Sequence, residues 1–229
     1  RNTILLSDME QRIRSLLVVS AFPKEGKSTT AIQLALAHAD QKKKTLLIDA
    51  DLRRPVIHKR FNVTPEVGLA DVVAGTIPWT SAVVAAPGYE HLFLLPAGVS
   101  SRRPSDALAA VLGTLLEEAA QEYDLVILDA PPALGFAEPI QMATRVDGVM
   151  VVARAGETDR KAVANVLALL RRARANVLGI VLNQYQAGMS ADHYAYGYYG
   201  DKYNVYGNPG GTESITKLAL AASDRPPQA

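Results

Sequence analysis

Short apolar runs alternate with segments of helical spacing along the first 184 residues of the chain. The runs are rich in Leu, Val and Ile without a polar alternation, which is typical of strands buried on both faces of a sheet. Six strands are predicted, over 16–20, 45–49, 92–96, 125–129, 148–153 and 177–182, and three helices, near 27–41, 105–121 and 159–174.

This alternation predicts an α/β fold with a doubly wound, mainly parallel sheet that carries helices on both faces. We expect one domain over residues 1–184. Beyond it the apolar period stops, and residues 184–211 contain seven tyrosines and six glycines. Residues 185–229 are therefore predicted to form a flexible, Tyr-rich tail.

Composition excludes several kinds of site. Of 229 residues, 48% are apolar, which is enough for the core of one domain, and 24 Lys and Arg against 23 Asp and Glu leave a net charge of only +1. A nucleic-acid partner is therefore not expected. The chain has no cysteine, its four histidines are scattered, and no run of about 18 apolar residues predicts a membrane span. We also find no signal peptide.

A candidate phosphate loop joins the first predicted strand to its helix. It reads Ala21-Phe22-Pro23-Lys24-Glu25-Gly26-Lys27-Ser28-Thr29. In the pattern G-x-x-x-x-G-K-[ST], backbone N–H groups wrap phosphates, the lysine reaches the β and γ oxygens and the hydroxyl binds Mg²⁺. Ala21 replaces the first glycine, while Gly26, Lys27 and Ser28 fit. A polar helix cap is the alternative, and Thr29 suits either an α-phosphate contact or that cap.

Three carboxylates follow two of the predicted strands. Asp49 and Asp51 end the second strand and Asp129 ends the fourth. A single Asp at such a place is often a loop cap. The carboxyl ends of parallel strands meet at one crevice, however, where carboxylates bind Mg²⁺ or deprotonate an attacking oxygen.

Together these blocks resemble a known family. Ser20–Thr30, Leu46–Pro55 and Leu125–Pro132 resemble the Walker A, A′ and B motifs of deviant Walker P-loop ATPases, and among these the bacterial tyrosine kinases (BY-kinases) of capsule and exopolysaccharide export. Two positions depart from related patterns. Lys24 replaces the glycine of the common Pro-Gly-Glu-Gly-Lys, and Phe22 stands where the partitioning branch has a second lysine. Other similar segments are Leu95–Gly98, Arg154–Thr158 and Leu182-Asn183.

The resemblance implies transfer of the γ-phosphoryl group of ATP to tyrosine, with Mg²⁺ as cofactor. Lys27 would neutralise the charge of the phosphates, and Asp49 would accept the tyrosine proton. Asp51 is the other candidate catalytic carboxylate, because the sequence leaves the roles of Asp49 and Asp51 exchangeable. The implied nucleotide ligands are Gly26, Lys27, Ser28, Thr29 and Asn183, the last on adenine, and the metal ligands are Ser28, Asp51 and Asp129. Arg53 and Arg54 are candidates for a phosphate or subunit contact, or for a solvated pair.

The Tyr-rich tail is the expected substrate. Between 185 and 210 there is only one lysine or arginine, Lys202, which argues against an RNA-stacking surface. A sticky linker is the remaining alternative. The resemblance implies phosphorylation between subunits of a ring that separates as phosphate charge accumulates. The candidate acceptors are Tyr194, Tyr196, Tyr198, Tyr199, Tyr203 and Tyr206.

The resemblance also implies partners: a homo-oligomeric ring, an upstream transmembrane activator on the same or another chain, and a protein-tyrosine phosphatase. Arg1-Asn2-Thr3-Ile4 resembles the end of the family's ring-assembly helix. We expect a soluble fragment that works at the cytoplasmic side of the bacterial inner membrane. Two other hypotheses stay open: a nucleotide-gated switch of the partitioning or cell-division-site type, and an ATP-binding scaffold.

Overall fold

A computed structural model of the chain describes residues 13–98 and 107–185. The chain divides into two units, residues 1–185 and 186–229, and the second lies wholly outside the described residues. The flexible tail therefore stays a prediction. Arg1–Ile4 and all six candidate acceptors also lie outside the described residues: Tyr194, Tyr196, Tyr198, Tyr199, Tyr203 and Tyr206.

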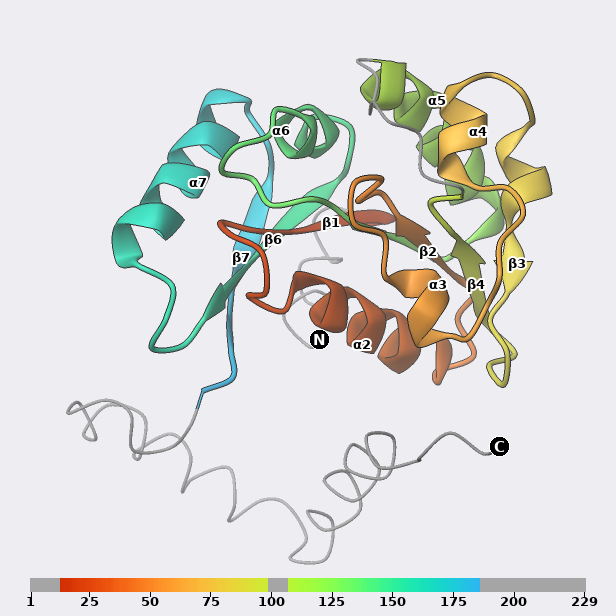
Figure 1. The fold of residues 1–229 in the computed structure, drawn as a ribbon, viewed down its shortest axis with the longest axis horizontal. Helices are drawn as coiled ribbons and strands as arrows, with labels where there is room; N and C mark the ends of the chain where they lie inside the picture. The colour runs from red at the N-terminus through yellow and green to blue at the C-terminus, as the bar shows by residue number, and fades with distance from the viewer. Residues whose placement is uncertain (1–12, 99–106, 186–229) are drawn as a thin grey trace, which may run out of the picture. The chain divides into compact units, whose positions relative to one another are not determined.

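Seven strands form one sheet in the order β3-β4-β2-β5-β1-β6-β7 (Figure 1). Only the β3–β4 pair is antiparallel. All six predicted strands are confirmed, whereas β3 was missed because two residues carry no pattern. The strands are β1 (Ser15–Ser20), β2 (Thr45–Asp49), β3 (Val84–Ala85), β4 (Leu92–Leu95), β5 (Leu125–Asp129), β6 (Gly148–Arg154) and β7 (Val177–Asn183).

Helices cover both faces of the sheet, which confirms the doubly wound fold. Helices α2 and α3 lie on one face, and α4, α5, α6 and α7 lie on the other (Figure 1). The three predicted helices are α2, α5 and α7. Within the described ranges, no helix has both the length and the apolar character that crossing a bilayer requires. The helices are α2 (Lys27–Ala39), α3 (Ile57–Arg60), α4 (Leu69–Val73), the 3₁₀ turn η1 (Trp79–Ala82), α5 (Ala107–Glu122), α6 (Glu138–Ala143) and α7 (Arg160–Arg172).

The central strands are buried on both sides, which explains their unbroken apolar character. In β1, Leu17 and Val19 belong to the core that includes α5 and α7, whereas Leu16 and Val18 belong to the core that includes α2. Successive side chains of a strand point to opposite faces, so both faces select apolar residues.

The register of the sheet brings the predicted site together. Strand β5 lies between β1 and β2, with Asp129 opposite Asp49 on one side and opposite Val18 on the other. All three strands run in the same direction, so the loop after β1 and the carboxylates that end β2 and β5 emerge at one edge.

Candidate active site

The phosphate loop is held in an unusual backbone conformation. Gly26, which precedes α2, has a φ of 97°, and Lys24 has a φ of 68°. A Cβ atom on Gly26 would lie 1.8 Å from Nδ2 of Asn183, so only glycine fits there. Lys24 takes the left-handed conformation at a cost of roughly 1–2 kcal/mol for a residue other than glycine. The lysine that departs from the family pattern thus keeps the backbone shape that a glycine would give.

Glu25 braces this loop from inside the protein. It is buried, and its Oε2 accepts a hydrogen bond of 2.8 Å from the backbone N–H of Phe22. The hydroxyl of Thr158 donates to its Oε1, and Asn183 Nδ2 donates to its backbone carbonyl at 3.0 Å. The sequence motifs assign no role to Glu25. An acidic residue within a phosphate loop was the only signal that the sequence offered, because Thr158, its partner, lies 133 residues away along the chain.

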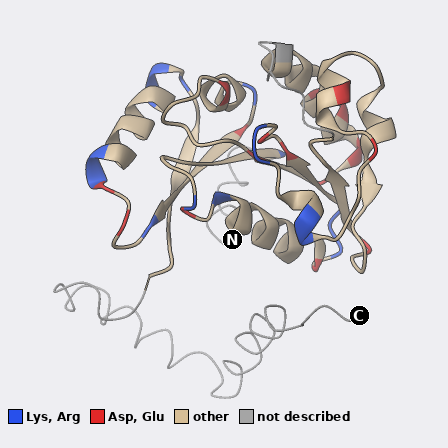
Figure 2. Cartoon of the chain, viewed as in Figure 1, with Lys and Arg blue, Asp and Glu red and all other residues tan. Residues whose placement is uncertain are grey.

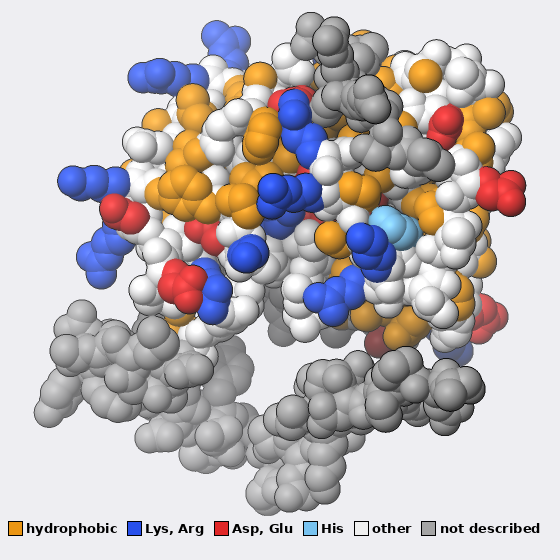
Figure 3. Space-filling model, viewed as in Figure 1, with side chains coloured by type: hydrophobic (Ala, Val, Ile, Leu, Met, Phe, Trp, Pro, Cys, Tyr) orange, Lys and Arg blue, Asp and Glu red, His pale blue; other side chains and the backbone are white. Residues whose placement is uncertain are grey.

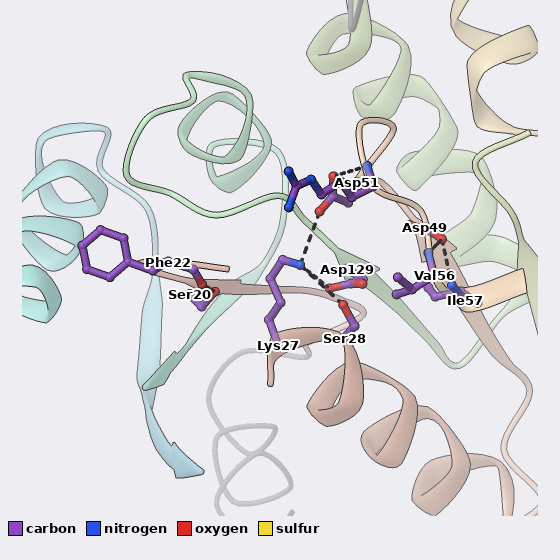
Figure 4. A network of polar contacts seen from close by, with 10 residues as sticks. Ser20, Phe22, Lys27, Ser28, Asp49, Asp51, Val56, Ile57 and Asp129 are labelled. Atoms are coloured by element: carbon purple, nitrogen blue, oxygen red, sulfur yellow. Dashed lines mark hydrogen bonds and ion pairs between the residues drawn. The ribbon is translucent and has the colours of Figure 1, made fainter. Parts of the chain in front are cut away.

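Lys27, the first residue of α2, lies among the predicted metal ligands. Its Nζ is 3.3 Å from Oδ2 of Asp51, 4.0 Å from Oδ1 of Asp129 and 3.4 Å from the Ser28 hydroxyl (Figure 4). Asp51 is fixed in turn, because its Oδ1 accepts a hydrogen bond from the backbone N–H of Arg54 at 3.1 Å. The structure therefore brings four of the predicted residues into contact.

Asp49 lies apart from this cluster. Its side chain points toward the start of α3 (Figure 4), where Oδ2 accepts hydrogen bonds of 3.0 Å from the backbone N–H groups of Val56 and Ile57. Its Oδ1 is buried and has no hydrogen-bond partner among the described residues. Burial, together with the negative charge of Asp129, raises the pKa of Asp49 to about 7.

Asp129 is a buried carboxylate with unsatisfied oxygens. It is fully buried, and among the described residues neither oxygen accepts a hydrogen bond of good geometry. Burial raises its pKa to about 6, although the Lys27 charge and the neighbouring Ser28 hydroxyl oppose the rise. Such orphaned oxygens are the ligands that a hard cation prefers, so Ser28, Asp51 and Asp129 fit Mg²⁺. The described residues hold no ready-made cluster of three acidic or histidine ligands, so phosphate oxygens and water would complete the coordination.

Lys27, Ser28 and Asp51 line a cavity of about 550 Å³ whose other lining residues are strongly cationic, whereas Asp129 lies buried outside the lining. It contains five Lys and Arg residues but only one acid, Asp51, as suits an anionic ligand. Figure 2 places basic positions on the segment after β2, on α3 and at the start of α2, and Figure 3 shows basic side chains gathered on this face. The lining residues are Pro23, Lys24, Gly26, Lys27, Ser28, Thr29, Asp51, Arg53, Arg54, Val56, Arg60, Pro131, Pro132, Phe136 and Gln184.

The two arginines after Asp51 have different surroundings. Arg53 donates to Glu138 at 2.6 Å, and its guanidinium lies 4.5 Å from the ring centre of Phe136. Arg54 lines the cavity, and its side chain has no partner among the described residues. Arg53 is thus anchored, whereas Arg54 keeps its charge for a ligand.

The predicted nucleotide ligands divide into two groups. Gly26, Lys27, Ser28 and Thr29 line the cavity, whereas Asn183 does not and instead contacts the loop through Glu25. Gln184, which follows β7 with a φ of 54°, lines the cavity in its place. Phe22 is 45% exposed, and its ring points away from the Lys27 cluster (Figure 4).

Comparison with known proteins agrees with this geometry. A family model described as "ParA: NUBPL iron-transfer P-loop NTPase" matches residues 13–222. Tyrosine-protein kinase YwqD of Bacillus subtilis is 36% identical over 205 residues, which cover 89% of this chain and 85% of YwqD. The succinoglycan biosynthesis transport protein ExoP of Rhizobium meliloti is 31% identical over 184 residues, 79% of this chain but only 23% of ExoP.

A solved structure gives the same result. The kinase domain of the Escherichia coli tyrosine kinase ETK superposes with a TM-score of 0.76 at 30% identity, over 83% of this chain and 76% of that one. The chain therefore belongs to the ParA-like P-loop NTPases and, within them, to the bacterial tyrosine-protein kinases.

Proposed function

We propose that the protein is an ATP- and Mg²⁺-dependent tyrosine autokinase that phosphorylates its own Tyr-rich segment in trans. The observation that carries this proposal is the position of Lys27, which lines a cationic cavity together with Asp51 and also contacts the buried Asp129 behind it. Phosphoryl transfer has a loose transition state, so positioning and charge neutralisation supply most of the catalysis.

The phosphate loop binds the nucleotide. Backbone N–H groups at the start of α2 and the Thr29 hydroxyl surround the phosphates, and Lys27 exchanges its carboxylate partners for the β and γ oxygens. Among the described residues the side chain of Asn183 bonds only through Nδ2, so its amide oxygen remains to accept a hydrogen bond from the amino group of adenine, although Asn183 borders the phosphate loop and does not line the cavity. Ser28, Asp51 and Asp129 would hold Mg²⁺, which would supply neutralisation of the charge on the β and γ phosphates.

A carboxylate accepts the proton during transfer. The tyrosine oxygen forms a bond to the γ-phosphorus while the bond to the bridging β–γ oxygen breaks, and ADP leaves. We assign the phenolic proton to Oδ1 of Asp49, because a pKa of about 7 suits a base that works near neutral pH. Asp51 is the second candidate, since it lines the cavity whereas Asp49 does not.

The proposed biological role is control of exopolysaccharide or capsule polymerisation and export. ExoP, whose name places it in succinoglycan transport, supports this role. Transfer in trans requires a homo-oligomer, and we propose a ring at the cytoplasmic face of the inner membrane, a transmembrane activator and an opposing tyrosine phosphatase. The proposed acceptors are Tyr194, Tyr196, Tyr198, Tyr199, Tyr203 and Tyr206.

Mass spectrometry of residues 185–210 after incubation with Mg-ATP tests the activity. We expect phosphate on several tyrosines, and a variant with all six acceptors changed to Phe should lose the label but still bind ATP. ATP hydrolysis without phosphotyrosine would instead favour the partitioning-type switch.

Mixing two variants tests the direction of transfer. A Lys27→Met chain supplies tyrosines but cannot react, and the six-Phe chain supplies only the site. Phosphate on the Lys27→Met chain is expected in the mixture and not in either variant alone. An unlabelled mixture, with labelled wild type, would show that transfer stays within one chain.

A further inference from the structure

Glu25 is the one residue between Pro23 and Thr29, all of them described, that does not line the cavity. It is only 5% exposed, and no Lys, Arg or His among the described residues pairs with it. We propose that Glu25 is a positioning residue that, with Thr158, holds the phosphate loop in its nucleotide-binding shape. The proposal depends on nucleotide binding at this loop and not on the identity of the phosphate acceptor.

Both carboxylate oxygens of Glu25 have a defined donor. Oε2 accepts from the N–H of Phe22 within the loop, and Oε1 accepts from the Thr158 hydroxyl beyond the end of β6. Thr158 is itself fixed, because its hydroxyl oxygen accepts a hydrogen bond of 2.8 Å from the backbone N–H of Arg154. A short relay therefore connects the loop to the last residue of β6.

The loop needs such a brace. Glu25 stands between Lys24 and Gly26, whose backbones are both left-handed. A residue other than glycine keeps this conformation only where the surroundings impose it. The contacts of Glu25 impose it from both sides, through its side chain and through the hydrogen bond from Asn183 Nδ2 to its carbonyl oxygen.

The negative charge of Glu25 allows a positioning role to be distinguished from the absence of one. A buried carboxylate beside a site for polyphosphate disfavours the ligand electrostatically, so a residue without a positioning role would bind ATP better as a neutral amide. If Glu25 holds the loop in shape, the neutral amide should instead lower the affinity for ATP. In Glu25→Gln the single amide oxygen can accept from the Phe22 N–H, but the NH₂ group can only donate to the Thr158 hydroxyl. The Thr158 hydroxyl then loses its acceptor, and a weaker neutral hydrogen bond replaces the charge-assisted one.

Equilibrium titration of the full chain with Mg-ATP, and with inorganic triphosphate and Mg²⁺, tests the role. If the unbraced loop keeps its binding shape about one-tenth of the time, the apparent affinity falls about tenfold. We expect that loss in Glu25→Gln for both ligands. Thr158→Val, which removes only the hydroxyl, should show a loss in the same direction, and Thr158→Ser should restore the affinity.

Asp147 provides a matched control. Its Oδ2 accepts from the N–H groups of Arg14 and Ser15 and from the Ser15 hydroxyl, so it braces the opposite end of β1. Asp147→Asn should lower the melting temperature and leave the affinity unchanged.

Unchanged or tighter Mg-ATP binding by Glu25→Gln would overturn the proposal. A loss of affinity for Mg-ATP but not for triphosphate would also overturn the proposal, since the substitution would then affect the contact with adenine and not the phosphate loop. If Glu25→Gln does not fold, unchanged affinity in Thr158→Val overturns it equally. A chain that binds Mg-ATP normally but labels no tyrosine would contradict the proposed function and leave the brace intact.

Discussion

Two groups of buried polar residues lie behind the lining of the nucleotide cavity, and they differ in whether their hydrogen bonds are satisfied. On the loop side, after β1, the polar groups of Glu25 have partners within the protein. On the carboxylate side, at the ends of β2 and β5, three buried oxygens of Asp49 and Asp129 have no hydrogen-bond partner among the described residues. The hydrogen bonds of Glu25 in the loop are therefore complete, whereas Asp129 keeps oxygens for a cation and Asp49 keeps one for a proton.

The two groups of residues therefore differ in how stability and function are related. A satisfied hydrogen bond in the loop stabilises the fold and shapes the site together, because the same contact does both. An unpartnered buried carboxylate costs stability and is kept for a ligand that supplies the missing charge. A substitution that removes a hydrogen-bond partner from the loop is thus expected to lower the free energy of unfolding, whereas removal of an unpartnered carboxylate charge is expected to raise it.

The largest effect is expected from Lys27→Met, which removes the cation that faces both sides. Autophosphorylation should fall by about 10³-fold or more, because the charge on the transferred phosphoryl group loses its neutralising partner. Phosphotyrosine on the intact chain is the measurement. The matched control is Lys24→Met, since Lys24 lines the same cavity and pairs with no described residue; comparable losses in both variants would contradict the assignment.

Asp129→Asn should change activity and stability in opposite directions. At pH 8 the variant removes a buried charge whose pKa is raised to about 6, so the nucleotide-free protein should gain about 1–3 kcal/mol in its free energy of unfolding. Mg²⁺-dependent ATP binding should fall by about 100-fold or more. Urea unfolding and nucleotide titration measure the two effects. A loss of stability would contradict the prediction, because it would show that the Asp129 carboxylate has stabilising partners in the nucleotide-free protein.

The carboxylates also predict how stability depends on pH. Asp49 and Asp129 have pKa values raised to about 7 and about 6, so between pH 4 and 7 the folded state holds protons that the unfolded state has lost. Their contribution is complete below pH 4 and disappears as pH rises through these values. The melting temperature without ligand should therefore decline from pH 5 to 8.

Mg²⁺ with ATP should flatten this decline, because a cation favours the ionised carboxylates. Phosphorylation itself should rise over the same range. The double variant Asp49→Asn, Asp129→Asn is the control. If its melting temperature declines with pH as steeply as that of wild type, groups other than these two carboxylates cause the decline.

The smallest effect is expected on the loop side. Lys24→Gly removes the left-handed strain at φ 68° but adds freedom to the unfolded chain, for a net gain of about 0.5 kcal/mol in unfolding free energy. Lys24→Ala keeps a Cβ and should show no gain. Chemical denaturation compares the two, and equal stabilities would mean that the loop carries no strain at this residue.

Much of the fold was predictable because the signal was local. Each long strand is an apolar run, and α2, α5 and α7 have helical spacing. The missed elements, β3, α3, α4, η1 and α6, contain two to six residues and are fixed by packing against distant parts of the chain.

The site was predictable as a set of residues but not as an arrangement. The motifs identified Lys27, Asp49, Asp51 and Asp129, yet nothing in the order Asp49-Ala50-Asp51 shows that one carboxylate faces the cavity and the other faces α3. That difference comes from two backbone N–H groups at the start of α3. The Glu25–Thr158 pair is equally a product of the sheet order, which places the end of β6 beside β1.

Gln184 at the cavity rim has a consequence for how much affinity the enzyme needs. The chain leaves β7 at this residue, and Tyr194, the first proposed acceptor, follows ten residues later; a chain of that length spans at most about 35 Å. In the proposed autokinase this segment serves as the tether of the acceptor tyrosines, and a flexible tether of that length gives a local concentration in the millimolar range. The proposed autokinase can therefore work with an acceptor KM of that size, and transfer in trans requires that the cavity of the neighbouring subunit lie within reach of the same segment.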